Sequence, residues 1–121
     1  TGNGLSQTIT GNDGANVLHD GGGDGADLLA GRSGDDLYRI HNSGTQVTET
    51  AGRGTDTVAA GVSYTLAADV SVEILRTNGT TGTADIDLRG NALSQTIYGN
   101  AGDNVLHDGG GDGRDTLAGY G

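Results

Sequence analysis

The sequence of 121 residues contains no cysteine, proline, methionine, tryptophan or phenylalanine, and it has only four tyrosines. So few large side chains exclude an ordinary globular core. The lack of cysteine excludes disulfides and fits a secreted bacterial protein that folds without them. There is no lysine, and six arginines stand against sixteen acidic residues for a net charge of −10, which argues against nucleic acid and anionic membranes as partners. No apolar run is long enough for a transmembrane segment.

Glycine is the most abundant residue, with 25 copies, but it does not recur at every third position, which excludes collagen. Short aliphatic residues return at intervals of 8 to 11 positions, and this spacing favours short strands over disorder. We expect one inward side chain on each strand. These residues are Ile9, Leu18, Leu29, Tyr38, Val47, Val58, Leu66, Leu75, Ile86, Ile97, Leu106 and Leu117.

A nine-residue pattern, Gly-Gly-x-Gly-x-Asp-x-aliphatic-x, is met in full at residues 22–30 and again at 110–118. Degenerate copies occupy residues 2–10, 11–19, 31–39 and 51–59. Six residues of each copy supply glycines, carbonyls and one carboxylate for a turn, and three make a short strand with one inward aliphatic. Two additional residues, Asp20 and Gly21, lengthen one turn without shifting the strands. A chain that repeats this unit winds into a solenoid.

The same block returns on a larger scale, because residues 2–33 align without a gap to residues 90–121, with 24 of 32 positions identical. The sequence therefore holds about one and a third copies of an 88-residue unit, and we expect it to belong to a longer tandem array. It divides into a nonapeptide block at 1–39, divergent solenoid rungs at 40–89 and a second nonapeptide block at 90–121.

The nonapeptides resemble the calcium-binding repeats of the RTX family, also called hemolysin-type repeats. The resemblance implies an all-β fold, a right-handed parallel β-roll, with calcium between turns two nonapeptides apart on one side. The turn at 11–16 would face that at 31–36, and 2–7 would face 22–27. Residues 40–89 match more loosely, through strand-like pieces at 47–49, 54–58, 63–66 and 72–75.

Calcium takes six to eight oxygen ligands in flexible geometry. Each turn offers the carbonyls of its first four residues and the Asp at position six, so Asp27, Asp36, Asp56 and Asp115 are the best side-chain ligands. The full candidate set is Gly11, Asp13, Gly14, Asn16, Asp20, Gly22, Gly23, Asp24, Gly25, Asp27, Gly31, Ser33, Gly34, Asp36, Gly52, Gly54, Asp56, Gly99, Gly102, Asn104, Asp108, Gly110, Gly111, Asp112, Gly113 and Asp115.

Some acidic and amide positions are weaker candidates. Asp20 and Asp108 either add a ligand to the longer turn or begin it as turn formers. Amides replace the Asp of position six at Gln7, Asn16, Gln95 and Asn104. Glu49 and Glu73 are expected to face solvent.

Two other binding motifs, the EF-hand and the P-loop, are excluded because the residues that they require are missing. An EF-hand needs flanking helices and a bidentate Glu at loop position twelve, and a P-loop needs a lysine. The pairs His19-Asp20 and His107-Asp108 resemble catalytic or zinc pairs, but position nine of a nonapeptide is expected to face outward. We therefore expect no enzymatic activity.

The expected function is that of a calcium-folded repeat segment of a large secreted or cell-surface protein, such as an adhesin, surface-layer component or extracellular filament. The resemblance implies type I secretion, and neighbouring repeats or end-to-end copies of the chain are the expected partners, with contacts near Thr1 and Gly121. The alternative is a noncatalytic RTX module of an extracellular polysaccharide-modifying enzyme, lipase or protease. Such a module could bind acidic polysaccharide through exposed Arg and Tyr.

Overall fold

The computed structural model describes residues 1–120 and contains twelve short strands and no helix in that range. Consequently, no helix among these residues could span a membrane. Gly121, the last residue of the predicted second block, lies outside the described range. The strands are β1 (Thr8–Thr10), β2 (Val17–His19), β3 (Leu28–Ala30), β4 (Leu37–Ile40), β5 (Gln46–Thr48), β6 (Thr57–Ala60), β7 (Tyr64–Thr65), β8 (Ile74–Thr77), β9 (Leu88–Arg89), β10 (Thr96–Tyr98), β11 (Leu106–His107) and β12 (Thr116–Ala118).

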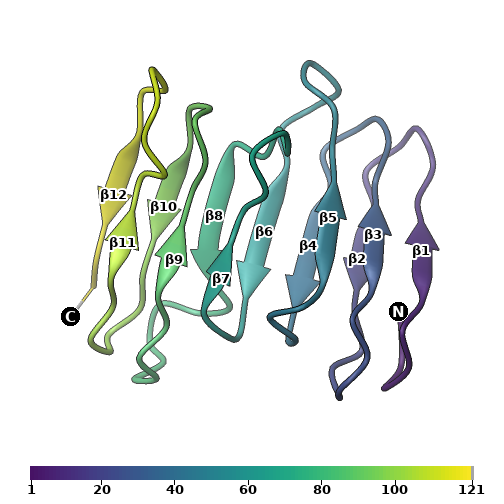
Figure 1. Ribbon diagram of the computed structural model, residues 1–121, viewed down its shortest axis with the longest axis horizontal. Helices are drawn as coiled ribbons and strands as arrows, with labels where there is room; N and C mark the ends of the chain where they lie inside the picture. Colours follow the sequence, from purple (N-terminus) through teal and green to yellow (C-terminus); the bar gives the residue numbers. More distant parts are fainter. Residues whose placement is uncertain (121) are drawn as a thin grey trace.

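The chain coils between two faces, with odd-numbered strands in front and even-numbered strands behind (Figure 1). The back face is one sheet of six strands, β2 to β12, and all its pairs are parallel. The front face consists of two sheets, β1-β3-β5 and β7-β9-β11. Two strands make one coil, so the chain forms a β-solenoid of about six coils, and the path in Figure 1 is right-handed. The predicted all-β parallel β-roll is confirmed.

The strand register follows the nonapeptide spacing. Thr8 pairs with Leu28, and Val17 pairs with Leu37, twenty positions later in each case. These coils hold one nine-residue unit and one unit of eleven, so the two additional residues lengthen a turn and leave the register unchanged. The next coil on the front face, in which Leu28 pairs with Gln46, holds two units of nine.

The core is a single line of inward side chains between the two faces. Nine of the twelve predicted inward residues are buried, while Ile9 and Leu106 are partly buried. Leu117 is 42% exposed, so its prediction is wrong: β12 belongs to the last described coil, and no further coil covers it. The divergent rungs add core residues that the spacing did not predict, namely Ile40, Ala60, Tyr64, Val70, Val72 and Leu88.

The 88-residue unit contains an odd number of strands. Nine strands, β1 to β9, precede the strand that repeats the sequence of β1. As a result, the first copy of the block (residues 2–33) starts in front with β1, whereas the second copy (residues 90–120 as described) starts behind with β10. Successive copies therefore show the same sequence on opposite faces.

Candidate metal-binding turns

The turns form two rows, one along each edge of the solenoid (Figure 1). The row that leads from front to back comprises residues 11–16, 31–36, 49–56, 66–73, 90–95 and 108–115. The row that leads from back to front comprises residues 2–7, 20–27, 41–45, 61–63, 78–87 and 99–105. The turns predicted to face each other do stack: the Asn16 amide donates to Asp36 Oδ1 at 2.7 Å, and the Gln7 amide donates to Asp27 Oδ1 at 2.7 Å.

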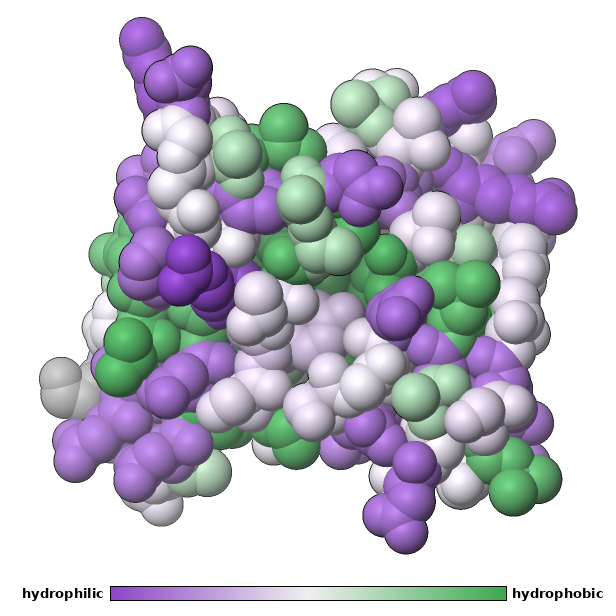
Figure 2. All heavy atoms as spheres, viewed as in Figure 1, coloured by the Kyte–Doolittle hydropathy of each residue, from purple (hydrophilic) through white to green (hydrophobic). Residues whose placement is uncertain are grey.

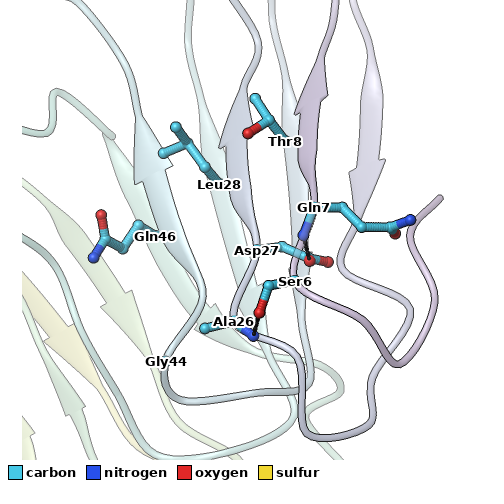
Figure 3. A pocket seen from close by; sticks show the side chains of 8 residues that line it. All are labelled: Ser6, Gln7, Thr8, Ala26, Asp27, Leu28, Gly44 and Gln46. Atoms are coloured by element: carbon cyan, nitrogen blue, oxygen red, sulfur yellow. Dashed lines mark hydrogen bonds between the residues drawn. The ribbon is translucent and has the colours of Figure 1, made fainter.

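The carboxylates of position six point back along the row, and each accepts a hydrogen bond from a main-chain amide of the preceding coil. The Asp36 amide donates to Asp56 Oδ1, and the Asp56 amide donates to Glu73 Oε2, both at 2.8 Å. Figure 3 shows the same contact between Gln7 and Asp27. These bonds use one oxygen of each carboxylate. The second oxygen, Oδ2, of both Asp27 and Asp36 is buried without a hydrogen-bond partner.

The glycine at position one of a turn leaves space beside these oxygens. A Cβ on Gly2 would come within 2.7 Å of Asp27 Oδ2 and 2.5 Å of the Asp20 carbonyl oxygen. A Cβ on Gly31 would collide with Asp36 Oδ2 and the Tyr38 hydroxyl. Glycine is therefore required where main chain and carboxylate oxygens converge on a small space, and this is a donor set that suits a hard cation.

Three buried carboxylates meet in the front-to-back row. Asp36, Glu49 and Asp56 are 2%, 5% and 1% exposed, and one oxygen from each lies within 4.8 Å of the others. The expectation that Glu49 faces solvent is wrong, because the Tyr38 hydroxyl donates to its Oε2 and the Thr50 amide donates to its Oε1 at 3.0 Å. The nonapeptide pattern gave no signal for Glu49, which lies between two matching units.

No arginine neutralises this cluster, since the only ion pairs among residues 1–120 join histidines to Asp20 or Asp108. Burial, aided by the carboxylates of Glu49, Glu73 and Asp36, raises the pKa of Asp56 to about 6. Two carboxylates 4.8 Å apart repel by about 3 kcal/mol at an effective dielectric constant near 20. The cluster therefore needs a cation or protons to balance its charge.

The tyrosine beside the cluster helps to fix it. Burial is the main cause that raises the pKa of Tyr38 above its ordinary value, and its hydrogen bond to Glu49 is the second. Its hydroxyl stays protonated, donates to Glu49 and accepts from the Gly31 amide at 2.8 Å. One side chain thus connects the core of the solenoid to the acidic turn.

A second cluster joins His19, Asp20 and His41. Asp20 is fully buried and accepts from the main-chain amides of Gly22, His41 and Asn42. Although burial raises its pKa, these bonds hold the pKa of Asp20 below its ordinary value. The Thr45 hydroxyl and His41 Nδ1 also lie within 3.2 Å of its carboxylate oxygens. Both carboxylate oxygens are thus engaged, which favours the turn-forming interpretation of Asp20.

The two histidines of this cluster stack with ring centroids 4.6 Å apart. His19 Nδ1 accepts from the Gly21 amide at 2.8 Å, and burial together with His41 lowers the pKa of His19. The sequence did not point to His41, which is two positions beyond the residue in register with His19. His19 Nδ1 is thus bonded to a turn amide, and His41 Nδ1 lies 3.2 Å from Asp20, so both histidines are part of the turn structure.

The remaining predicted ligands lie in less enclosed places. Asp115 Oδ1 accepts from the Gln95 amide at 2.7 Å, and Asp115 is half-buried. Asp13, Asp24 and Asp112 are exposed on the outside of their turns. Asn104 Oδ1 accepts from the Asn100 amide at 2.7 Å. The cluster of Asp36, Glu49 and Asp56 is thus the most enclosed acidic group in the described chain.

No protein-family model, no curated protein and no solved structure matches this chain.

Proposed function

We propose that the chain is a calcium-binding structural repeat segment of a large secreted or cell-surface protein. The observation that carries this proposal is the buried, unneutralised cluster of Asp36, Glu49 and Asp56. Its donors are all oxygen, and the buried Oδ2 of Asp36 has no other partner. Calcium accepts such a flexible set of carboxylates and carbonyls, whereas magnesium demands near-ideal octahedral geometry. The nonapeptides add the resemblance to RTX repeats.

Calcium binding would be coupled to folding. The three carboxylates come from two separate turns, so their site does not exist in the unfolded chain, and binding free energy becomes folding free energy. Extracellular calcium modules bind with dissociation constants of roughly 10⁻⁴–10⁻³ M. A chain tuned to that range stays unfolded at low cytosolic calcium and folds after export.

The proposed role is structural and not enzymatic. The solenoid is built from contacts between neighbouring coils, and such a rod is extended by adding units at its ends. His107 repeats the contact of His19, because its Nδ1 accepts from the Gly109 amide at 2.8 Å. Both His-Asp pairs therefore shape turns. Neighbouring repeats and end-to-end copies of the chain are the proposed partners.

Circular dichroism of the whole chain tests the proposal. We expect a β spectrum in excess calcium, its loss in excess EGTA and its return when calcium is restored, while magnesium alone does not restore it. Asp56→Asn should raise the calcium concentration needed for folding, whereas Asp24→Asn, at an exposed position of an intact nonapeptide, should leave it unchanged. A β spectrum that persists unaltered in EGTA would contradict the proposal.

A further inference from the structure

The front face is interrupted between β5 and β7. Each of these strands is the edge of its own sheet, although β4 and β6 behind them are paired. Figure 1 shows the two strands set farther apart than their neighbours on that face. A groove of about 580 Å³ lies between them, lined by residues 43–48 on one side and by residues 64–67, 69 and 70 on the other. In the space-filling view of this face, the centre is mostly pale or green, while hydrophilic side chains lie toward the turns and toward the C-terminal end (Figure 2).

At one end of the groove, a tyrosine hydroxyl takes the place of a strand amide. In the preceding coil the Gln46 amide donates to the Asp27 carbonyl at 2.8 Å. The corresponding acceptor of the next coil, the Thr45 carbonyl, is taken by the Tyr64 hydroxyl at 2.9 Å. At the other end, the Ser71 amide approaches the Glu49 carbonyl at 3.4 Å. Between these two contacts, the three residues of β5 have no strand beside them on the side that faces the groove.

The main chain of both walls faces the groove. The Gln46 amide points toward β3, and successive residues of a strand alternate in direction, so the amide and carbonyl of Val47 point toward the groove. On the opposite wall, the amides of Tyr64 and Leu66 donate toward β9, so those of Thr65 point toward β5. Within residues 1–120, no hydrogen bond joins Val47 to Thr65, and two edges with unpaired main-chain groups face each other.

We propose that this groove binds one extended strand of another polypeptide, which completes the front face between β5 and β7. Unpaired donors and acceptors on two strand edges are the chemistry that strand addition uses. A parallel segment of four residues would make two main-chain hydrogen bonds to Val47 with its first and third residues. Its second and fourth residues would make two more to Thr65.

The side chains of the groove set the preferred sequence of the strand. Its second residue would face the buried side chains of Val47, Tyr64, Leu66 and Val70, which favour a small aliphatic group. The first and third residues would face solvent and be polar, as in the chain's own Thr-Ile-Thr strand, β1. The one charged residue along the groove is Asp69, on a chain of net charge −10, so a basic side chain next to this motif is favoured.

The probe is a fluorescein-labelled peptide, Gln-Thr-Ile-Thr-Gly-Arg, added to the whole chain in calcium buffer. We expect saturable binding by fluorescence anisotropy and slower hydrogen exchange at the Val47 and Thr65 amides. Methylation of the peptide nitrogens of its second Thr and its Gly removes the two donors to Val47 and Thr65, so binding should weaken at least about tenfold. Equal binding of the methylated peptide, no saturable binding, or saturation without protection of these two amides would overturn the proposal.

Substitutions in the chain give a matched control. Thr65→Trp fills the groove from an exposed position, and Thr10→Trp places the same side chain on the exposed side of β1. The first should abolish peptide binding, the second should leave it within about twofold, and both should keep the β spectrum because neither side chain is buried. Equal loss in the two variants would place the peptide elsewhere. Should Thr65→Trp unfold, the methylated peptide on the unsubstituted chain still decides the question.

Discussion

The first and second copies of the repeated block have nearly the same sequence but lie on opposite faces of the solenoid. Their local contacts agree: the amide of Gln7 donates to Asp27 Oδ1, and that of Gln95 donates to Asp115 Oδ1, at 2.7 Å in both copies. Likewise, the Gly21 amide donates to His19 Nδ1, and the Gly109 amide donates to His107 Nδ1, at 2.8 Å in both copies. The block therefore determines its own turn geometry, whichever face it occupies.

Burial differs sharply between the same two copies. The side chain of Asp20 is fully buried and that of Asp108 is 52% exposed, while Leu29 is buried and Leu117 is 42% exposed. A following coil covers the first copy, and in the described chain none follows the second. Enclosure thus comes from adjacent coils, as expected for a structure built from nearest-neighbour contacts. Matched positions in the two copies allow this idea to be tested with the same substitution.

The largest difference is expected for Asp20→Ala against Asp108→Ala. Loss of Asp20 leaves the part-buried amides of His41 and Asn42 and the buried Thr45 hydroxyl without an acceptor, which should cost about 3 kcal/mol of the free energy of unfolding. Asp108 accepts only from the Gly110 amide in an exposed turn, so its loss should cost less than about 0.5 kcal/mol. Urea unfolding in calcium buffer measures both. Equal costs would show that the covering coil does not matter.

A smaller difference is expected for Gly31→Ala against Gly119→Ala, which occupy equivalent positions. The new Cβ at Gly31 would collide with Asp36 and Tyr38, whereas nothing lies within 4 Å of a Cβ at Gly119. We expect the first to reduce the free energy of unfolding by about 2 kcal/mol and the second to have almost no effect. Thermal unfolding in excess calcium checks this. A neutral Gly31→Ala would mean that the turn is looser than described.

The calcium midpoint should separate charged from neutral turn residues. Asp27→Ala removes a buried carboxylate with an unpartnered oxygen, and Gln7→Ala removes a neutral, half-exposed amide from the stacked turn. We expect the first to raise the midpoint about tenfold and the second less than about twofold, since calcium prefers carboxylate ligands. Calcium titration followed by circular dichroism gives both values. Similar shifts would remove Asp27 from the ligand set.

The smallest expected effect is proton release from Asp56. Its pKa in the calcium-free fold, about 6, lies above the ordinary value of 3.8, so the proton-bound form is favoured below pH 6 and the fold loses stability as the pH rises through 6. In a stabilising osmolyte that keeps the calcium-free chain folded, calcium displaces that proton, so binding at pH 6 should release about half a proton, and binding at pH 8 almost none. Calorimetry in buffers of different ionisation enthalpy measures the release. Asp56→Asn should abolish it and Asp115→Asn should preserve it; the opposite pattern would contradict the assignment.

Ten of the twelve strands were predictable because each contains the inward residue expected from the nonapeptide spacing, and the pieces around Val47, Val58 and Leu75 do form strands. The other two, β7 and β9, lie beside the predicted Leu66 and Ile86, which are buried but outside the strands. Glu49 was not predictable in the same way. It lies outside the pattern, and its burial depends on the hydroxyl of Tyr38, which the spacing marks only as an inward side chain. The contact between His41 and the buried Asp20 could not be predicted either, since the turn at 41–45 has no glycine-rich motif.

The interruption of the front face could not be read from the sequence either. At one end of it the hydroxyl of Tyr64 donates to the carbonyl of Thr45, which in a paired sheet would accept from a strand amide. Spacing predicts which residues turn inward, but it does not say whether adjacent coils pair on both faces. The divergent rungs at 40–89 therefore contain the features that the repeat pattern could not supply.

A crystal structure of the whole chain grown in calcium tests the central claim most directly. The proposal predicts anomalous density for an ion bound by oxygens of Asp36, Glu49 and Asp56, at ligand distances of roughly 2.3–2.6 Å. The same crystals should show the main-chain bonds of Asp20 unchanged and no ion bound to the His19–His41 pair. A cluster that holds only water or shared protons, with the turns folded as described, would contradict the claim that calcium completes this fold.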